Sequence, residues 1–255
     1  MMSSISSDTC SPGADEARSL AEQAYRAIED MVVRLDLPPG ARLTENDLSQ
    51  RVGFGRTPVR EALQRLHYDG LVRVFPRKGI AVSEVNPLDV LVALDVYAAV
   101  ERLVAAAAAR RAGRAEEALA EQMAGAMARA AAVGDIGGFV ETDKAIDRIL
   151  AELSGNPYAA RALVPLQAMA RRAWLFFRRE SDLAPAAERH AELLKAVCSG
   201  MLRRPRRQRN RSSPTCAKPS RRPSAVSSTA SFPGSRPAPV ASRFVPRHME
   251  GRRRP

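Results

Sequence analysis

The order of predicted elements over residues 18–83 restricts the fold of this chain more than any other sequence feature. Apolar residues recur at helical spacing over residues 18–35, and the following DLPPGARL ends that helix because it contains two prolines and a glycine. Thr44 begins a short helix with a capping box, in which its side chain bonds the amide of Asp47, and Gly53 ends that helix. After a three-residue turn, RTPVREALQRLHYDG predicts another helix, and LVRVFPRKGIAV predicts a two-stranded hairpin.

This order of elements, a helix, a short helix, a turn, another helix and a hairpin, is typical of a winged helix-turn-helix at these lengths. In that fold the second helix of the pair enters the DNA major groove by its N-terminal end. Here that end carries Arg56, Thr57 and Arg60, which can point away from an inward side that includes Val59 and Leu63. Arginine bonds guanine or phosphate, and a threonine hydroxyl bonds phosphate. The pattern therefore predicts contacts to double-stranded DNA. A solvated helix face, or a winged helix that binds proteins, is the alternative.

The predicted hairpin turns at residues 76–79 and adds further positive charge. Its tip carries Arg77 and Lys78, within reach of the minor groove or the DNA backbone. Residues 18–83 hold 11 basic and 8 acidic side chains, a net charge of +3. This local excess favours contact with phosphates.

The run PGARLTENDLSQRVGFGRTPVREALQRLHYDGLVRVFPRKGIAV closely resembles the DNA-binding domain of the GntR family of bacterial transcription regulators, and the likeness extends over about 65 residues. The resemblance implies a homodimer that binds a palindromic operator and acts as a repressor or an activator. By position, the family's contact residues fall on Arg56, Thr57, Arg60, Lys78 and Gly79. Gly55 departs from the family, which often has a serine there; because glycine is tolerated at an N-cap, we expect weaker anchoring and an intact fold.

The chain's net charge of +12 has a different origin. Residues 201–255 hold 15 of the 40 Lys and Arg residues and one of the 28 acidic residues, so they carry +14 and the first 200 residues carry −2. Half of the 18 prolines also lie there, and no helical or strand period is present, which predicts a disordered tail. The tail is interpreted either as the product of a frameshift or as a basic arm that binds phosphates.

Between these parts, the sequence predicts a bundle of helices. Expected helices cover residues 86–111, 114–133, 137–153, 157–180 and about 185–199. No strand-like alternation interrupts them, so the predicted fold class is mainly α, with an antiparallel all-α bundle after the winged helix-turn-helix. The predicted organisation is a disordered N-terminus over 1–17, a DNA-binding domain over 18–84, an effector-binding and dimerisation domain, truncated at its end, over 85–200, and the tail over 201–255.

The bundle resembles the FadR-like C-terminal (FCD) domain, which senses a small metabolite. The runs that carry this looser likeness are YAAVERLVAAAAA, with Glu101, then FVETDKAIDRILAELSGNPY and ERHAELLKAV. Many members of that branch hold a divalent metal with one Asp and three His, and by position Asp143 and His190 match two of these ligands. Asp147 stands where the first histidine is expected, and the last histidine would fall in the tail.

Two alternatives remain for these side chains. Asp143, Asp147 and His190 could hold a hard cation such as Mg²⁺ or Mn²⁺. In the other interpretation the two aspartates form a solvated or salt-bridged stripe and His190 lines a pocket or lies on the surface. Arg171, Arg172, Trp174 and Arg178–Arg179 also lie on or just after the long helix, where one inward arginine would suit a carboxylate effector and outward arginines would not.

Other function classes find little support in the sequence. It contains no GxSxG, Walker loop, HExxH or paired-cysteine motif, so we do not expect an enzyme; metal-assisted hydrolysis at the two aspartates and His190 is the remaining enzymatic alternative. Three unpaired cysteines and the lack of a long apolar run or a signal peptide predict a cytoplasmic protein that does not enter membranes. A truncated product without activity is a further alternative.

Overall fold

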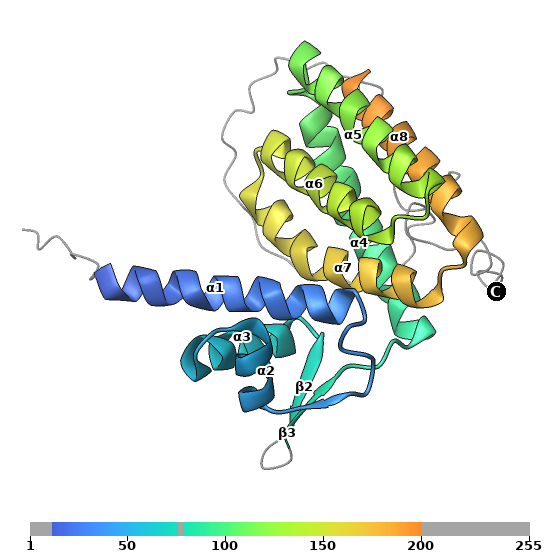
Figure 1. Ribbon diagram of the computed structural model, residues 1–255. Coiled ribbons are helices and arrows are strands. Elements are labelled where there is room, and N and C mark those ends of the chain that lie inside the picture. Colours follow the sequence, from blue (N-terminus) through green and yellow to red (C-terminus); the bar gives the residue numbers. More distant parts are fainter. Residues whose placement is uncertain (1–11, 76–78, 200–255) are drawn as a thin grey trace, which may run out of the picture.

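A computed structural model describes residues 12–75 and 79–199, and this part of the chain forms two domains (Figure 1). The N-terminal domain contains three helices and three short strands. In chain order these elements are α1 (Pro12–Val33), β1 (Arg42–Leu43), α2 (Glu45–Val52), α3 (Arg56–Tyr68), β2 (Val72–Phe75) and β3 (Gly79–Val82). The winged helix-turn-helix predicted from the sequence is confirmed.

The first helix and the capped short helix follow largely from local sequence. Thr44 accepts a hydrogen bond of 3.1 Å from the amide of Asp47, and Gly53 ends α2 in the left-handed conformation, with a φ of +74°. The N-cap of α3 is Gly55, which provides no side-chain bond to the helix. α1 begins at Pro12 and ends at Val33, so it starts before the predicted residue 18. It ends two residues early because Leu35 adopts a φ of +69°.

The wing is a three-stranded sheet, where the sequence predicted a two-stranded hairpin. β3 is the central strand, paired antiparallel with β2 on one side and with β1 on the other. Ile80 lies opposite Val74 of β2 and opposite Leu43 of β1. The additional strand anchors the segment between α1 and α2 to the wing.

The core of this domain forms where α1 packs against α3 and the sheet. Ile28, Leu48, Val59 and Leu66 are completely buried there. Leu20, one of the apolar residues that recur at helical spacing over residues 18–35 and are therefore expected on the inward face, is instead 39% exposed. The N-terminal half of α1 extends past the helices that cover its C-terminal half, so this position lies outside the core (Figure 1).

The second domain is an all-α bundle. It consists of α4 (Pro87–Ala109), α5 (Arg114–Ala132), α6 (Ile136–Ser154), α7 (Pro157–Phe177), the 3-10 turn η1 (Glu180–Asp182) and α8 (Leu183–Cys198). The predicted helices are confirmed to within a few residues; the largest difference is that α7 ends at Phe177, after which the chain turns through η1. α4 packs against α6 and α7, and α5 packs against α8. Within the described ranges, no helix has the length and apolarity that crossing a membrane requires.

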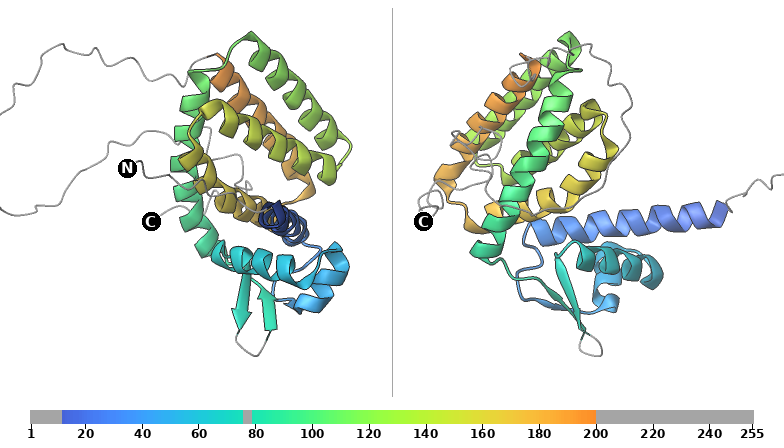
Figure 2. Two further views of the ribbon diagram at one scale, coloured as in Figure 1. Left: turned by 90° about the vertical axis from the view of Figure 1, so that its left-hand side faces the viewer. Right: turned by 180° about the vertical axis from the view of Figure 1, so that it is seen from behind.

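The two domains share an interface along α1. The C-terminal half of α1 lies between α3 on one side and α7 on the other (Figures 1 and 2). Ala168 of α7 is completely buried in the apolar cluster of the N-terminal domain. Arg172 of α7 donates a hydrogen bond of 2.5 Å to the carbonyl oxygen of Ser83, just after the wing. The bundle therefore holds both α1 and the base of the wing.

Candidate DNA-contact face and buried ionic cluster

The N-terminal end of α3 presents the predicted DNA-contact side chains to solvent. Arg56, Thr57 and Arg60 are exposed, whereas Val59 and Leu63, on the opposite face, are buried. The burial pattern follows from helical periodicity, because positions three and four apart share a face. The helix therefore offers two guanidinium groups and one hydroxyl on one surface.

Both arginines contact α2 in this structure. Arg56 donates to the side-chain oxygen of Asn46 at 3.3 Å, and Arg60 forms an ion pair of 2.7 Å with Glu45. The hydrogen bond from Arg60 lowers the pKa of Glu45. These exposed contacts are weak and screened by salt, so a phosphate or a guanine edge can replace them.

The wing is described on both sides of its tip. Gly79 begins β3 with a φ of +89°, a conformation that a side chain would strain, and it pairs with Phe75 of β2. Arg77 and Lys78, the other predicted wing contacts, lie outside the described residues. His67, near the end of α3, contacts the carbonyl oxygen of Val72 through Nδ1 at 3.1 Å.

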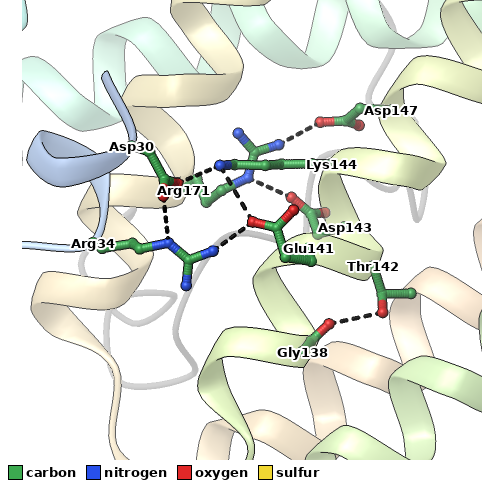
Figure 3. A network of polar contacts seen from close by, with 9 residues as sticks. All are labelled: Asp30, Arg34, Gly138, Glu141, Thr142, Asp143, Lys144, Asp147 and Arg171. Carbon is green, nitrogen blue, oxygen red and sulfur yellow. Dashed lines mark hydrogen bonds and ion pairs between the residues drawn. The ribbon is translucent and has the colours of Figure 1, made fainter. Parts of the chain in front are cut away.

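In the bundle, the two predicted aspartates, Asp143 and Asp147, come together around Arg171 (Figure 3), and His190 contacts Asp143. Arg171 of α7 donates from Nε to Asp143 and from a terminal nitrogen to Asp147, each at 2.7 Å. His190 of α8 contacts the second oxygen of Asp143 through Nε2 at 2.8 Å and the carbonyl oxygen of Ala186 through Nδ1 at 2.7 Å. We call Asp143, Asp147, Arg171 and His190 the buried ionic cluster.

Burial makes the charges of this cluster interdependent. Asp143 and His190 are almost completely buried, and Arg171 is 4% exposed. Burial acts to lower the pKa of Arg171, but Asp143 and Asp147 outweigh it and raise that pKa. The guanidinium is therefore a permanent internal cation that neutralises two carboxylates away from water.

This arrangement does not fit the divalent metal that the family resemblance suggested for Asp143, Asp147 and His190. Both carboxylates already bind the guanidinium of Arg171, and the remaining oxygen of Asp143 contacts His190. Across residues 12–75 and 79–199, no group of three or more His, Cys, Asp or Glu side chains is placed to hold a metal ion. The salt-bridged alternative for the two aspartates is the one that the geometry supports.

The other candidate pocket residues have structural partners. Arg172 is buried and bonds Ser83 at the domain interface, and burial lowers its pKa to about 10. Trp174 is buried and stacks on Phe139, with ring centroids 5.2 Å apart. Arg171 is the inward arginine that the sequence suggested for a carboxylate effector, and here it binds two carboxylates of its own chain.

A second ionic network joins the domains beside this cluster. Asp30 of α1 pairs with Lys144 of α6, and Arg34 of α1 pairs with Glu141 of α6 (Figure 3). Partial burial acts to raise the pKa of Asp30, but the bonds from Lys144 and Arg34 outweigh it and lower that pKa. α6 thus carries the buried ionic cluster on one side and contacts to α1 on another.

Sequence reasoning did not identify this interdomain network. Its members are charged residues on amphipathic helices, a pattern that most exposed helix faces share. The separations of 114 residues between Asp30 and Lys144, and 107 between Arg34 and Glu141, leave no local signal. Only the spacing of Glu141 and Lys144, one turn apart on α6, was visible in advance.

Comparison with known proteins places both domains. Residues 20–82 match the bacterial regulatory proteins of the gntR family, and residues 93–208 match the FCD domain. The chain therefore joins a DNA-binding domain of the gntR family to an FCD domain. The domains and relatives that it matches are those of transcription regulators and not of enzymes.

The curated relatives match about a third of this chain. An HTH-type transcriptional regulator in an unstable DNA locus of Streptomyces ambofaciens is 45% identical over 84 residues, which are 33% of this chain and 36% of that protein. The transcriptional repressor RspR of Escherichia coli is 33% identical over 88 residues, 34% of this chain and 39% of that protein. The match therefore spans little more than a third of either relative.

Solved structures match across both domains. E. coli McbR/YncC has a TM-score of 0.64 at 21% identity, covering 72% of this chain and 88% of that one. A GntR-type protein from Rhodococcus sp. RHA1 has a TM-score of 0.56 at 22% identity over the same shares. At these identities the likeness shows the fold alone.

Proposed function

We propose that this GntR protein is a ligand-responsive transcription regulator that binds a palindromic DNA operator as a homodimer in the cytoplasm. The observation that carries the proposal is the exposed face of α3 with Arg56, Thr57 and Arg60, on a domain whose family match covers residues 20–82. Side chains at the N-terminal end of such a helix reach base edges and phosphates in the major groove. Lys78 and Arg77 would add backbone contacts from the wing.

An apolar stripe on α4 supports the homodimer. Leu88, Val92, Val96 and Leu103 are 71%, 69%, 52% and 52% exposed. Their spacing places them on one face of a helix at the side of the bundle (Figure 2). A contiguous apolar face of this kind marks an interaction surface, and a second copy of the same stripe is self-complementary across a two-fold axis.

The helical domain would sense a small organic acid. A ligand changes DNA affinity only if it binds the DNA-competent arrangement and the other arrangement unequally. α1 and the base of the wing both contact α6 or α7, so a change in the bundle alters the position of the DNA-contact face. RspR, which is similar over 88 residues, is a repressor, and this favours repression here.

Loss of the α3 arginines tests the proposal. Arg56→Ala with Arg60→Ala removes two DNA contacts worth about 1–3 kcal/mol each, so we expect specific affinity to fall at least about 30-fold. The readout is a gel shift with DNA fragments that flank the gene. Arg114→Ala with Arg129→Ala, two exposed arginines of α5, is the matched control and should bind as wild type. Equal binding by the α3 variant and the control would refute the assigned face.

A further inference from the structure

A groove between the two domains has the chemistry of a ligand site that lies outside the buried ionic cluster. It has a volume of about 550 Å³ and is lined by side chains of α1, α3, α6 and α7. Each long helix contributes positions one turn apart, such as Tyr25 and Glu29 from α1, and Lys144 and Arg148 from α6. Small-molecule sites commonly occupy volumes of roughly 300–1,000 Å³ at domain interfaces.

The lining of the groove carries an excess of positive charge. Six cationic side chains face it, Arg26, Arg65, Lys144, Arg148, Arg161 and Arg171, against the carboxylates of Glu22, Glu29 and Asp147. Four of the six cations are already paired. Arg26 and Arg65 pair with Glu22, Lys144 pairs with Asp30, and Arg171 pairs with Asp143 and Asp147.

Two of the cations keep their charge available. Arg148 of α6 and Arg161 of α7 are exposed, and among the described residues neither guanidinium makes a hydrogen bond or an ion pair; Arg161 lies over the ring of Tyr158. Burial raises the pKa of Glu29, against the opposing effects of Arg171 and Lys144, so its carboxyl repels an anion less than an exposed one would.

We propose that this groove is the effector site and that it binds a small carboxylate with two or more negative charges. The inference rests on the proposed function of a ligand-responsive regulator and names the place and chemistry of the ligand. Arg148 and Arg161 bind the carboxylate groups, since a guanidinium forms paired hydrogen bonds with a carboxylate. A single charge leaves part of the cationic excess unmatched, so anions with several carboxylates bind more tightly.

The groove also reaches the helix that contacts DNA. Arg65 lies on α3, nine residues after Arg56, or about 14 Å along the helix axis. Its guanidinium lies 3.8 Å from the ring centroid of Tyr25, whose hydroxyl donates to Asp69 at 2.8 Å, just after α3. A ligand in the groove contacts α3 and α1 on one side and α6 and α7 on the other. Its affinity therefore depends on how the two domains are placed, which is the requirement for coupling to DNA.

Calorimetric titration of the full chain tests the site. The probes are succinate and propane-1,2,3-tricarboxylate, with acetate as the single-charge comparison and chloride to match ionic strength. We expect the tricarboxylate to bind most tightly and acetate not at all. Arg148→Gln with Arg161→Gln should weaken tricarboxylate binding at least tenfold. Arg114→Gln with Arg129→Gln, on α5, should leave it within twofold.

Three results overturn the inference: no binding of either polycarboxylate at millimolar concentration, equal binding of acetate, or equal loss in both double variants. The same preparations are assayed by gel shift, where the tricarboxylate should change affinity by about 5- to 150-fold in wild type and leave Arg148→Gln with Arg161→Gln unaffected. Binding in the groove without an effect on DNA also overturns it. If DNA binding proves independent of Arg56 and Arg60, the proposed function fails, whereas the carboxylate titration still reports on the groove.

Discussion

Removing the positive charge of Arg171 should destabilise the protein strongly. Arg171→Met keeps most of the side-chain volume but leaves Asp143 and Asp147 without their cation. The three side chains are 4%, 1% and 7% exposed, so water does not replace the lost partner. The loss of stability should therefore come from two unpaired buried carboxylates and only to a small degree from packing.

The structure sets the size of this effect. Arg171 makes two bonds of 2.7 Å to the carboxylates, and hydrogen bonds to charged groups contribute about 1.5–3 kcal/mol each. Removing one partner of a buried ion pair destabilises proteins by about 3–5 kcal/mol, because the other charge is left buried and unpaired. We expect a loss of about 3–5 kcal/mol in the free energy of unfolding. Over a folded region of this size, that loss lowers the melting temperature by about 6–20 °C.

Urea and thermal unfolding followed by circular dichroism measure the loss. Arg148→Met, an exposed position on α6, is the control and should stay within about 0.5 kcal/mol of wild type. Asp143→Asn with Asp147→Asn in the Arg171→Met background should recover most of the stability, because no charge then remains unpaired. A loss below about 1 kcal/mol, or a triple variant no better than the single one, would refute the electrostatic reasoning.

The same variant should respond to pH in a defined direction. Without the guanidinium, burial raises the pKa of the two carboxyls in the folded state above their unfolded values. The folded state then binds more protons than the unfolded state, so Arg171→Met should gain stability as the pH falls from 7 to 5. The difference in the free energy of unfolding between Arg171→Met and wild type should therefore be smaller at pH 5 than at pH 7. An equal difference at both pH values would contradict the raised pKa of the two carboxyls.

Three further predictions concern the cap, the interface and the stripe. Thr44→Ala should cost about 0.5–2 kcal/mol of stability in urea unfolding, with Thr44→Ser near wild type; equal loss in both would argue against capping. A double-mutant cycle of Asp30→Asn and Lys144→Met should give a coupling free energy of about 0.2–1 kcal/mol. Because the pKa of Asp30 is lowered in the folded state, this coupling is complete above the unfolded pKa of about 3.9 and disappears as the pH falls through the folded pKa. A coupling that survives below the folded pKa would contradict the ion pair between Asp30 and Lys144. If the proposed homodimer forms through the apolar stripe of α4, Val92→Asp should convert it to a monomer in analytical ultracentrifugation, whereas Val133→Asp, at an 80% exposed site on the end of α5, should not; a dimer that persists in Val92→Asp would place the interface elsewhere.

Features set by neighbouring residues were predictable from the sequence. The bond from Asp47 to Thr44 and the left-handed Gly53 define α2, and both depend on contacts within a few residues. The buried Val59 and Leu63 and the exposed Arg60 follow from a single helical period. The three residues grouped as candidate ligands do lie together in the structure, because a family resemblance carries information about tertiary position.

Features set by distant packing were not predictable. β1 has two residues, too few to show strand alternation, and it exists because Leu43 lies opposite Ile80. Arg171 and Arg172 are adjacent and both buried, because α7 is covered on one side by the bundle and on another by α1 and the wing. The apolar periodicity of a helix indicates a single inward face. It therefore could not show that Arg171 binds two aspartates of the bundle while Arg172 bonds Ser83 of the other domain.

The bond between Arg172 and the Ser83 carbonyl affects how the protein would search for its operator. Only four residues, 83–86, connect the wing to α4, and a linker of that length alone would still let the DNA-binding domain reorient. Anchored to α7, the domain loses little rotational freedom when it meets DNA, so less of the contact energy is spent on ordering it. In a dimer, the same anchoring would hold the α3 helices of the two subunits at a fixed separation. The protein should therefore bind more weakly to operators whose half-site spacing differs by one or two base pairs from the preferred one, even though it does not contact the intervening bases.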